Sequence, residues 1–114
     1  MNHLEGTAWL KIHDGKLAEF KNLASQFMET VKAKDTGTLQ YDWYFNEDET
    51  VCVIKEKYMD SAAVFVHLGN VGELLAKVGL ISDFTVEFYG NPSEELRAAL
   101  LGAGVKIYSF FGGL

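Results

Sequence analysis

The sequence contains few of the residues that support cross-links, metal sites or thiol chemistry. Cys52 is the only cysteine among the 114 residues, so no disulfide can form within the chain, which fits a reducing compartment. The histidines His3, His13 and His67 lack the spacing that metal ligands show. Cys52 lies in a β-rich apolar run, without the nearby histidine that a nucleophilic cysteine needs. We therefore expect no metal, no other cofactor and no thiol-based reaction.

Positive charge and long apolar runs are also scarce. Ten Lys and Arg stand against 16 Asp and Glu, and the net charge is −6. Nucleic acids and anionic membranes favour basic patches, so we expect neither as a partner. No apolar run approaches the roughly 20 residues of a membrane helix, and the N-terminus alternates apolar and polar residues unlike a signal peptide. We expect a soluble, cytoplasmic protein with a single domain over residues 1–114.

Apolar residues recur with the period of a strand in several segments. Alternation, which is typical of a strand with one buried face, occupies residues 6–13, 38–45 and 83–89. Residues 50–59 are rich in Val and Ile, which also predicts a strand, and their latter half is polar. Residues 105–111 are apolar on both faces, which predicts a final strand that is covered on both sides.

Three segments between these strands carry apolar residues at spacings of three and four, which predicts amphipathic helices. The apolar stripe of the first helix consists of Leu17, Phe20, Ala24, Phe27 and Val31. The second helix contains Gly69 and Gly72, and each glycine costs about 1 kcal/mol relative to alanine in a helix interior. We therefore expect a break or a kink near these two residues.

Residues that favour helix starts precede each of the three helices. Asp14 is expected to cap the first helix, and Asp60 or Ser61 the second, by accepting a backbone N–H. The third helix is expected to have Asn91 as its cap and Pro92 at its first helical position.

The order of the predicted elements defines the fold class. The order β-α-β-β-α-β, followed by an extra α-β, predicts an α+β fold of the ferredoxin-like type, with an antiparallel sheet and helices on one face. The other face would carry Trp9, Tyr44 and Tyr89. An exposed aromatic surface of this kind predicts a homodimer that buries it. The alternative is that the final helix and strand cover this face within the monomer.

The segment around the predicted hairpin resembles a known family. The matching residues, TLQYDWYFNEDETVCVIKEKYMDSAAVFVHL, occupy positions 38–68 and continue through VGELL and the EFYG strand. This sequence is similar to the antibiotic biosynthesis monooxygenase family of the dimeric α+β barrel superfamily, and to its quinol monooxygenase subgroup. The resemblance implies a dimeric barrel with a mostly apolar pocket in each subunit. It also implies oxidation of a quinol-like or polycyclic hydroxy-aromatic by O2 without metal or flavin.

Within this segment, His67 is the candidate general base because the pKa of a free histidine lies near neutrality. Asn70 shares its helical stripe and is a candidate to bind a substrate oxygen. The alternative for His67 is a surface histidine, or one that binds a backbone carbonyl. These two residues form the predicted catalytic pair.

Aromatic residues on the predicted strands are candidates for substrate binding. Trp43 and Tyr41 share the apolar face of their strand and could stack on an aromatic substrate, although such residues are often plain core. Tyr58 and Glu56, at the polar end of the next strand, are weaker candidates, because that end could simply face solvent. Haem-degrading members of the superfamily use a helical His with a Trp and an Asn from neighbouring strands. His67 and Trp43 could fill two of these roles, but residues 6–13 contain no Asn, so we do not expect haem degradation.

Two other classes of function remain open from the sequence. One is a dimeric protein that binds a small apolar or aromatic ligand without chemistry, and the other is a purely structural dimer. Oxygen consumption with a bound aromatic separates the enzyme from the binding protein. A structural dimer would have no cavity large enough for an aromatic ring.

Overall fold

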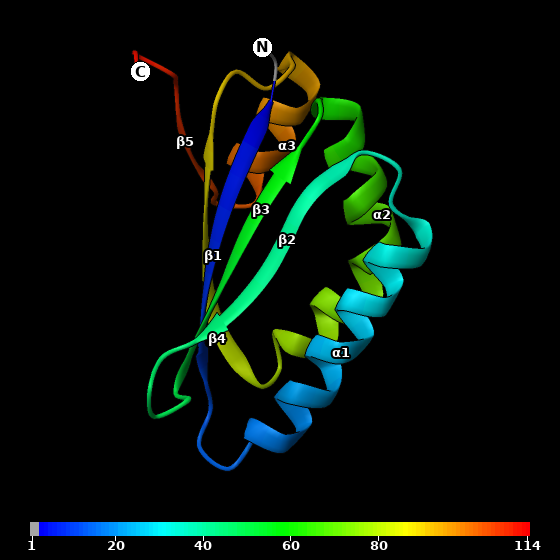
Figure 1. Ribbon diagram of the computed structural model, residues 1–114, viewed down its shortest axis with the longest axis vertical. Coiled ribbons are helices and arrows are strands. Elements are labelled where there is room, and N and C mark those ends of the chain that lie inside the picture. Colours follow the sequence, from blue (N-terminus) through cyan, green and yellow to red (C-terminus); the bar gives the residue numbers. More distant parts are fainter. Residues whose placement is uncertain (1–2) are drawn as a thin grey trace.

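The chain folds into a five-stranded sheet with three helices (Figure 1). The computed structural model describes residues 3–114. The elements are β1 (Leu4–Ile12), α1 (Leu17–Lys34), β2 (Thr38–Phe45), β3 (Val51–Tyr58), α2 (Ser61–Val78), β4 (Ser82–Tyr89), α3 (Glu94–Gly102) and β5 (Lys106–Tyr108). Among these elements, no helix is both long and apolar enough to cross a membrane.

The strand order β2-β3-β1-β4-β5 confirms the predicted ferredoxin-like α+β fold. The first four strands in this order pair antiparallel, as expected. β5 pairs parallel to β4, so the complete sheet is mixed. The reason is that α3 connects β4 to β5, and a crossover helix of this kind returns the chain in its original direction.

The predicted apolar stripe of α1 packs on the inner face of the sheet. Four of its five members, together with the neighbouring Leu23, are buried. Phe20 and Phe27 are the largest of them and contact Trp43 of β2, at ring-centroid distances of 6.2 and 5.4 Å. This contact fixes α1 over the part of β2 that carries the candidate aromatic residues.

α2 runs from Ser61 to Val78 without the predicted break. Gly69 and Gly72 lie on its exposed side, and no other group comes within 4 Å of the place a side chain would take. The opposite side buries Val64 and Val71 completely, so packing outweighs the weak helix propensity of the glycines. Asp60 caps this helix as predicted, and accepts a hydrogen bond from the backbone N–H of Ala63 at 2.9 Å.

The predicted caps of the other two helices are wrong. A turn at Gly15, with φ of +77°, separates Asp14 from the helix, and Lys16 occupies the cap position without a side-chain hydrogen bond. In α3 the cap is Ser93, whose hydroxyl accepts a hydrogen bond from the backbone N–H of Leu96 at 3.1 Å. Pro92 therefore precedes the helix instead of opening it.

The sheet departs from the predicted pattern at three places. A bulge between Thr38 and Gln40 turns Leu39 outward, and 52% of this residue is exposed. The alternation over residues 83–89 predicts Phe84 inside the core together with Val86 and Phe88, but Phe84 is 45% exposed. The predicted final strand is only three residues long and lies at the sheet edge, where Phe110 and Phe111 beyond it are exposed. The prediction that this strand is covered on both sides is therefore wrong for the monomer.

Within residues 3–114, the outer face of the sheet carries no helix (Figure 1). α3 packs on the inner side, because its buried Leu96 and Leu100 belong to the same cluster as Tyr58, Val64 and Phe88. β5 only extends the sheet. The alternative in which the final helix and strand cover the outer face is therefore wrong.

Candidate active site

A cavity of about 340 Å³ lies between the inner face of the sheet and the helices. Its wall is mostly apolar, and side chains from α1, α2, α3 and four strands contribute to it. Four titratable side chains interrupt the apolar wall: Tyr41, Glu56, Tyr58 and His67. A cavity of this size, with a few polar groups in apolar surroundings, is typical of a small-molecule site.

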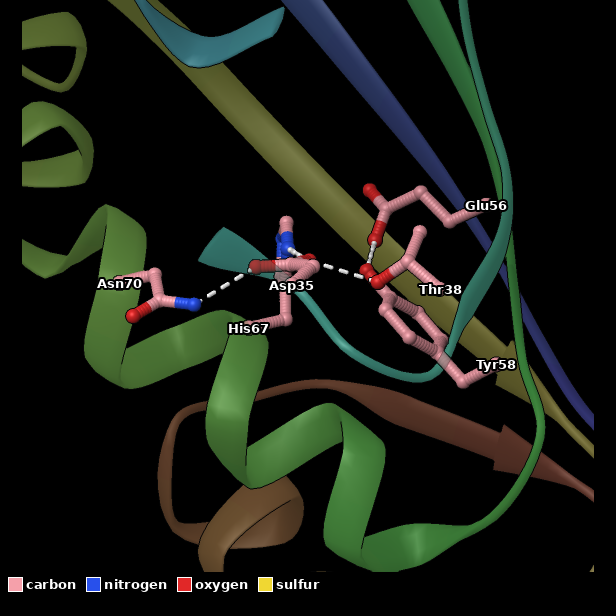
Figure 2. A network of polar contacts seen from close by, with 6 residues as sticks. All are labelled: Asp35, Thr38, Glu56, Tyr58, His67 and Asn70. Atoms are coloured by element: carbon pink, nitrogen blue, oxygen red, sulfur yellow. Dashed lines mark hydrogen bonds and ion pairs between the residues drawn. The ribbon is translucent and has the colours of Figure 1, made fainter. Parts of the chain in front are cut away.

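His67 belongs to a polar network centred on the carboxyl group of Asp35 (Figure 2). The Nδ1 of His67 lies 2.8 Å from Asp35 Oδ2, and the Thr38 hydroxyl donates to the same oxygen at 2.6 Å. The side-chain amide of Asn70 donates to Asp35 Oδ1 at 2.8 Å. Only 6% of the His67 side chain and 2% of the Asp35 side chain are exposed. Asp35 therefore holds two residues of α2 and one of β2 together.

Local structure brings Asp35 to this position. Asp35 ends α1, and its backbone N–H donates to the carbonyl of Val31 at 3.0 Å. The chain then passes against the start of α2 at Gly37, where a Cβ would lie 2.6 Å from the Cβ of Ala63. Only glycine permits this close approach. His67 lies one helical turn beyond Ala63 on the same side of α2, so the approach places Asp35 beside it.

The charge on Asp35 determines the proton position on His67. Burial alone would raise the pKa of Asp35, but hydrogen bonds from Asn70, Thr38 and His67 outweigh burial and place the pKa below its usual range. Asp35 is therefore a carboxylate near neutral pH and can only accept hydrogen bonds. His67 must carry a proton on Nδ1, and its neutral form keeps Nε2 as an acceptor. A histidine held in this way can take a proton from a bound molecule.

Aromatic rings surround His67 inside the cavity. The rings of Tyr41 and Tyr58 lie 5.2 and 5.3 Å from the His67 ring between centroids. Burial is the main cause that raises the pKa of both tyrosines well above the usual range, so both remain protonated. Trp43 lies edge-on to Tyr41 at 5.9 Å. These rings form an aromatic wall around the candidate base.

The structure brings most of the predicted site residues together. His67, Tyr41, Trp43 and Tyr58 all line the cavity. Asn70 does not line it, and its amide is bound to Asp35 instead. The polar end of β3, with Glu56 and Tyr58, faces the cavity and not the solvent.

Sequence reasoning missed Asp35. In the sequence, Asp35-Thr36-Gly37 predicts only the end of the first helix. It lies 32 positions before His67, and no local pattern links the two. The one available signal is an acidic residue three positions before the strand that carries the aromatic candidates, which is weak on its own.

Cys52 is buried on the inner face of the sheet, and burial raises the pKa of its thiol to about 11. We expect the folded protein at pH 8 to react with Ellman's reagent at least about 100-fold more slowly than the protein in urea, because few molecules carry the thiolate. Stopped-flow absorbance would measure both rates. Equal rates would contradict the buried position.

Within residues 3–114, no three His, Cys, Asp or Glu side chains form a group that could hold a metal ion.

A model of one protein family matches the chain over residues 7–72, and its description is antibiotic biosynthesis monooxygenase. The match spans β1 to most of α2 and includes Asp35, Trp43 and His67. No curated protein matches the sequence.

Solved structures of several proteins share the fold. MupZ from Pseudomonas fluorescens has a TM-score of 0.88 at 22% identity, over 100% of this chain and 94% of its own. A Caulobacter crescentus protein, provisionally named an antibiotic biosynthesis monooxygenase, has a TM-score of 0.70 at 25% identity, over 76% and 87% of the two chains. A Nitrosomonas europaea protein with the same provisional name has a TM-score of 0.70 at 16% identity, over 79% and 90%. The first and third of these likenesses show the fold alone.

Proposed function

Because the chain belongs to the antibiotic biosynthesis monooxygenase family, we propose that its cavity binds a quinol-like or polycyclic hydroxy-aromatic and oxidises it with O2 without a cofactor. The observation that carries this proposal is a histidine base, oriented by a buried carboxylate, inside an aromatic-lined cavity. The proposal includes membership of the quinol monooxygenase subgroup of this family.

In this mechanism His67 starts the reaction and the substrate supplies the electrons. Nε2 of His67 takes a proton from the bound aromatic, and Asp35 stabilises the imidazolium that forms. The resulting anion is electron-rich enough to react with O2 directly. One oxygen atom enters the product as a ring carbonyl, and the other leaves as water with the two hydrogens that the substrate loses.

The other site residues hold the substrate and the base. Tyr41, Trp43 and Tyr58 provide the surface on which the aromatic ring packs. Asn70 acts through Asp35, because its amide hydrogen bond keeps the carboxylate oriented toward His67. Asn70 is therefore a positioning residue in this proposal.

Oxygen uptake tests the proposal. Metal-free and flavin-free protein would be mixed with a panel of hydroquinones and anthrones in an oxygen electrode. Uptake faster than the spontaneous reaction is expected with at least one of them. No added uptake, with ligands that still quench tryptophan fluorescence, would favour the alternative of a non-catalytic dimeric binding protein.

We also propose that two copies of the chain pack through the outer faces of their sheets, which would form a dimeric α+β barrel. The strand register aligns Tyr44, Val53, Trp9 and Thr85 in one row across four strands of this face. Tyr44 is 53% exposed and Trp9 is 37% exposed. Apolar surface of this kind, at the centre of an uncovered sheet, favours a symmetric dimer.

Trp9→Glu is expected to convert this dimer into a monomer, because two carboxylates would meet near the symmetry axis. Light scattering after gel filtration should then change from twice the 12.7 kDa subunit mass to that mass itself. Phe65→Glu is a matched control, since Phe65 is similarly exposed, at 40%, on α2. A dimer that persists in Trp9→Glu, or a monomeric wild type, would contradict the proposed interface.

A further inference from the structure

The cavity contains a carboxyl group, that of Glu56, which the proposed oxidation does not use. Glu56 lies on the inner face of β3, between Gly6 of β1 and Tyr41 of β2 in the strand register. Its side chain lines the cavity. Within the part of the chain that the structure describes, none of the ion pairs includes Glu56. It is therefore a carboxyl group beside the proposed ligand site without a cationic partner.

Tyr58 holds this carboxyl group in a fixed orientation. The Tyr58 hydroxyl donates a hydrogen bond to Glu56 Oε1 (Figure 2). The Tyr58 ring is fully buried and stacks on Phe88 with an angle of 8° between the ring planes. Phe88 in turn lies over Gly6, where a Cβ would come within 3.2 Å of its ring. Because Tyr58 occupies one carboxyl oxygen, the second oxygen is left to bind another group.

The surroundings of Glu56 favour its protonated form. Burial raises its pKa, and the negative charge of Asp35 raises it further. The hydrogen bond from Tyr58 and the positive charge that His67 can carry act in the opposite direction, and burial outweighs them. Glu56 can thus keep a proton under conditions in which an exposed glutamate has lost it. A neutral carboxylic acid donates a hydrogen bond to a carbonyl oxygen.

Tyr58 contacts both Glu56 and His67. The His67 ring is 5.3 Å from the Tyr58 ring, and Glu56 binds the Tyr58 hydroxyl. The base and the acid therefore lie beside the same tyrosine, and within residues 3–114 no hydrogen bond engages Nε2 of His67 or the second carboxyl oxygen of Glu56. A ligand that binds beside Tyr58 can meet both groups at once.

We propose that this cavity catalyses keto–enol exchange on a cyclic aromatic ketone, with His67 as the base and Glu56 as the acid, and without O2. A C–H bond near the carbonyl breaks, its proton moves to Nε2 of His67, and its electron pair forms the enol double bond. The carbonyl oxygen receives the proton of Glu56. In the reverse step the enol hydroxyl returns its proton to Glu56 and Nε2 of His67 gives its proton to the carbon, so no oxidant or reductant is consumed. This inference rests on the proposed role of His67, and it adds Glu56 as a further catalytic residue.

Deuterium exchange under nitrogen tests the inference, with anthrone as the probe. Wild-type protein in D2O is expected to accelerate the loss of the ¹H NMR signal of the anthrone CH2 group. Glu56→Gln should lower the accelerated rate about 100-fold, as is typical for loss of a general acid. Glutamine can still accept the hydrogen bond from Tyr58, so the variant is expected to fold. Tyr58→Phe provides a second test, because it removes only the hydroxyl that orients the acid, and it should lower the rate at least about 10-fold.

Glu87→Gln is the matched control. Glu87 also accepts a hydrogen bond from a tyrosine two residues later, Tyr89, at 2.7 Å, but it lies on the outer face of the sheet. The Glu87→Gln variant should exchange the anthrone CH2 protons as fast as the wild type does, and its oligomeric mass should be unchanged. A wild type that does not accelerate exchange, or a Glu56→Gln variant that is as fast as the wild type, would overturn the inference.

The two proposals fail in different ways. If exchange depends on Glu56 and His67 but no O2 is consumed, the inference holds and the monooxygenase function falls. If O2 uptake depends on His67 while exchange is indifferent to Glu56→Gln, the proposed function holds and the inference is overturned.

Discussion

His67→Ala is expected to lower oxygen uptake with an aromatic substrate about 100-fold or more, because the variant lacks the group that takes the first proton. The loss should appear in kcat at saturating substrate, since the aromatic wall that binds the ring is retained. Substrate affinity would be measured separately by the quenching of tryptophan fluorescence. Asp35 keeps its hydrogen bonds with Thr38 and Asn70 in this variant, which favours folding.

His13→Ala is the matched control for this experiment. His13 also pairs with an aspartate, Asp83, at 3.0 Å, but the pair is exposed and lies outside the cavity. Uptake by this variant should equal that of the wild type. If His67→Ala retained full uptake in a protein that still binds the aromatic, His67 would have no role as a base.

Much of the fold could be predicted from the sequence because each strand and helix buries one face. Alternation located β2 to the residue, and the apolar stripe located α1. The errors arose where position depends on contacts instead of pattern. The turn at Gly15 places the start of α1 after Asp14. The bulge in β2 places the side chain of Leu39 on the exposed side. The apolar tail after β5 has a strand-like composition, but nothing in the monomer covers it.

The candidate site could be predicted only in part, because some of its contacts depend on packing and not on a sequence pattern. His67 could be chosen from its chemistry, and Trp43 from the face of its strand. Asp35 could not, because it meets His67 only through the packing of α1 against α2 and the close approach at Gly37. Glu56 was undervalued because a charged residue near a strand end usually faces solvent. Its burial follows from the helices that close over β3.

Asp35→Ala is expected to lower the free energy of unfolding by about 3 kcal/mol, because it leaves three buried groups without their common partner. His67, Asn70 and Thr38 all bind this carboxylate, whose side chain is only 2% exposed. Urea unfolding at pH 7, followed by circular dichroism, would measure the difference. Asp83→Ala removes the exposed carboxylate that binds His13 and should have little effect. Equal stability of Asp35→Ala and wild type would show that the network does not hold α2 to β2.

The same carboxylate should make stability depend on pH in a predictable direction. The pKa of Asp35 is lower in the folded protein than the ordinary value of 3.8, so the folded state favours the ionised form. Its contribution is fully present well above pH 3.8 and is lost as the pH falls through the lower, folded-state pKa. Asp35→Asn cannot ionise and lacks this contribution at every pH. The stability difference between wild type and Asp35→Asn should therefore shrink as the pH falls below about 4. A difference that stayed constant from pH 7 to pH 3 would mean that Asp35 does not carry its charge in the folded state.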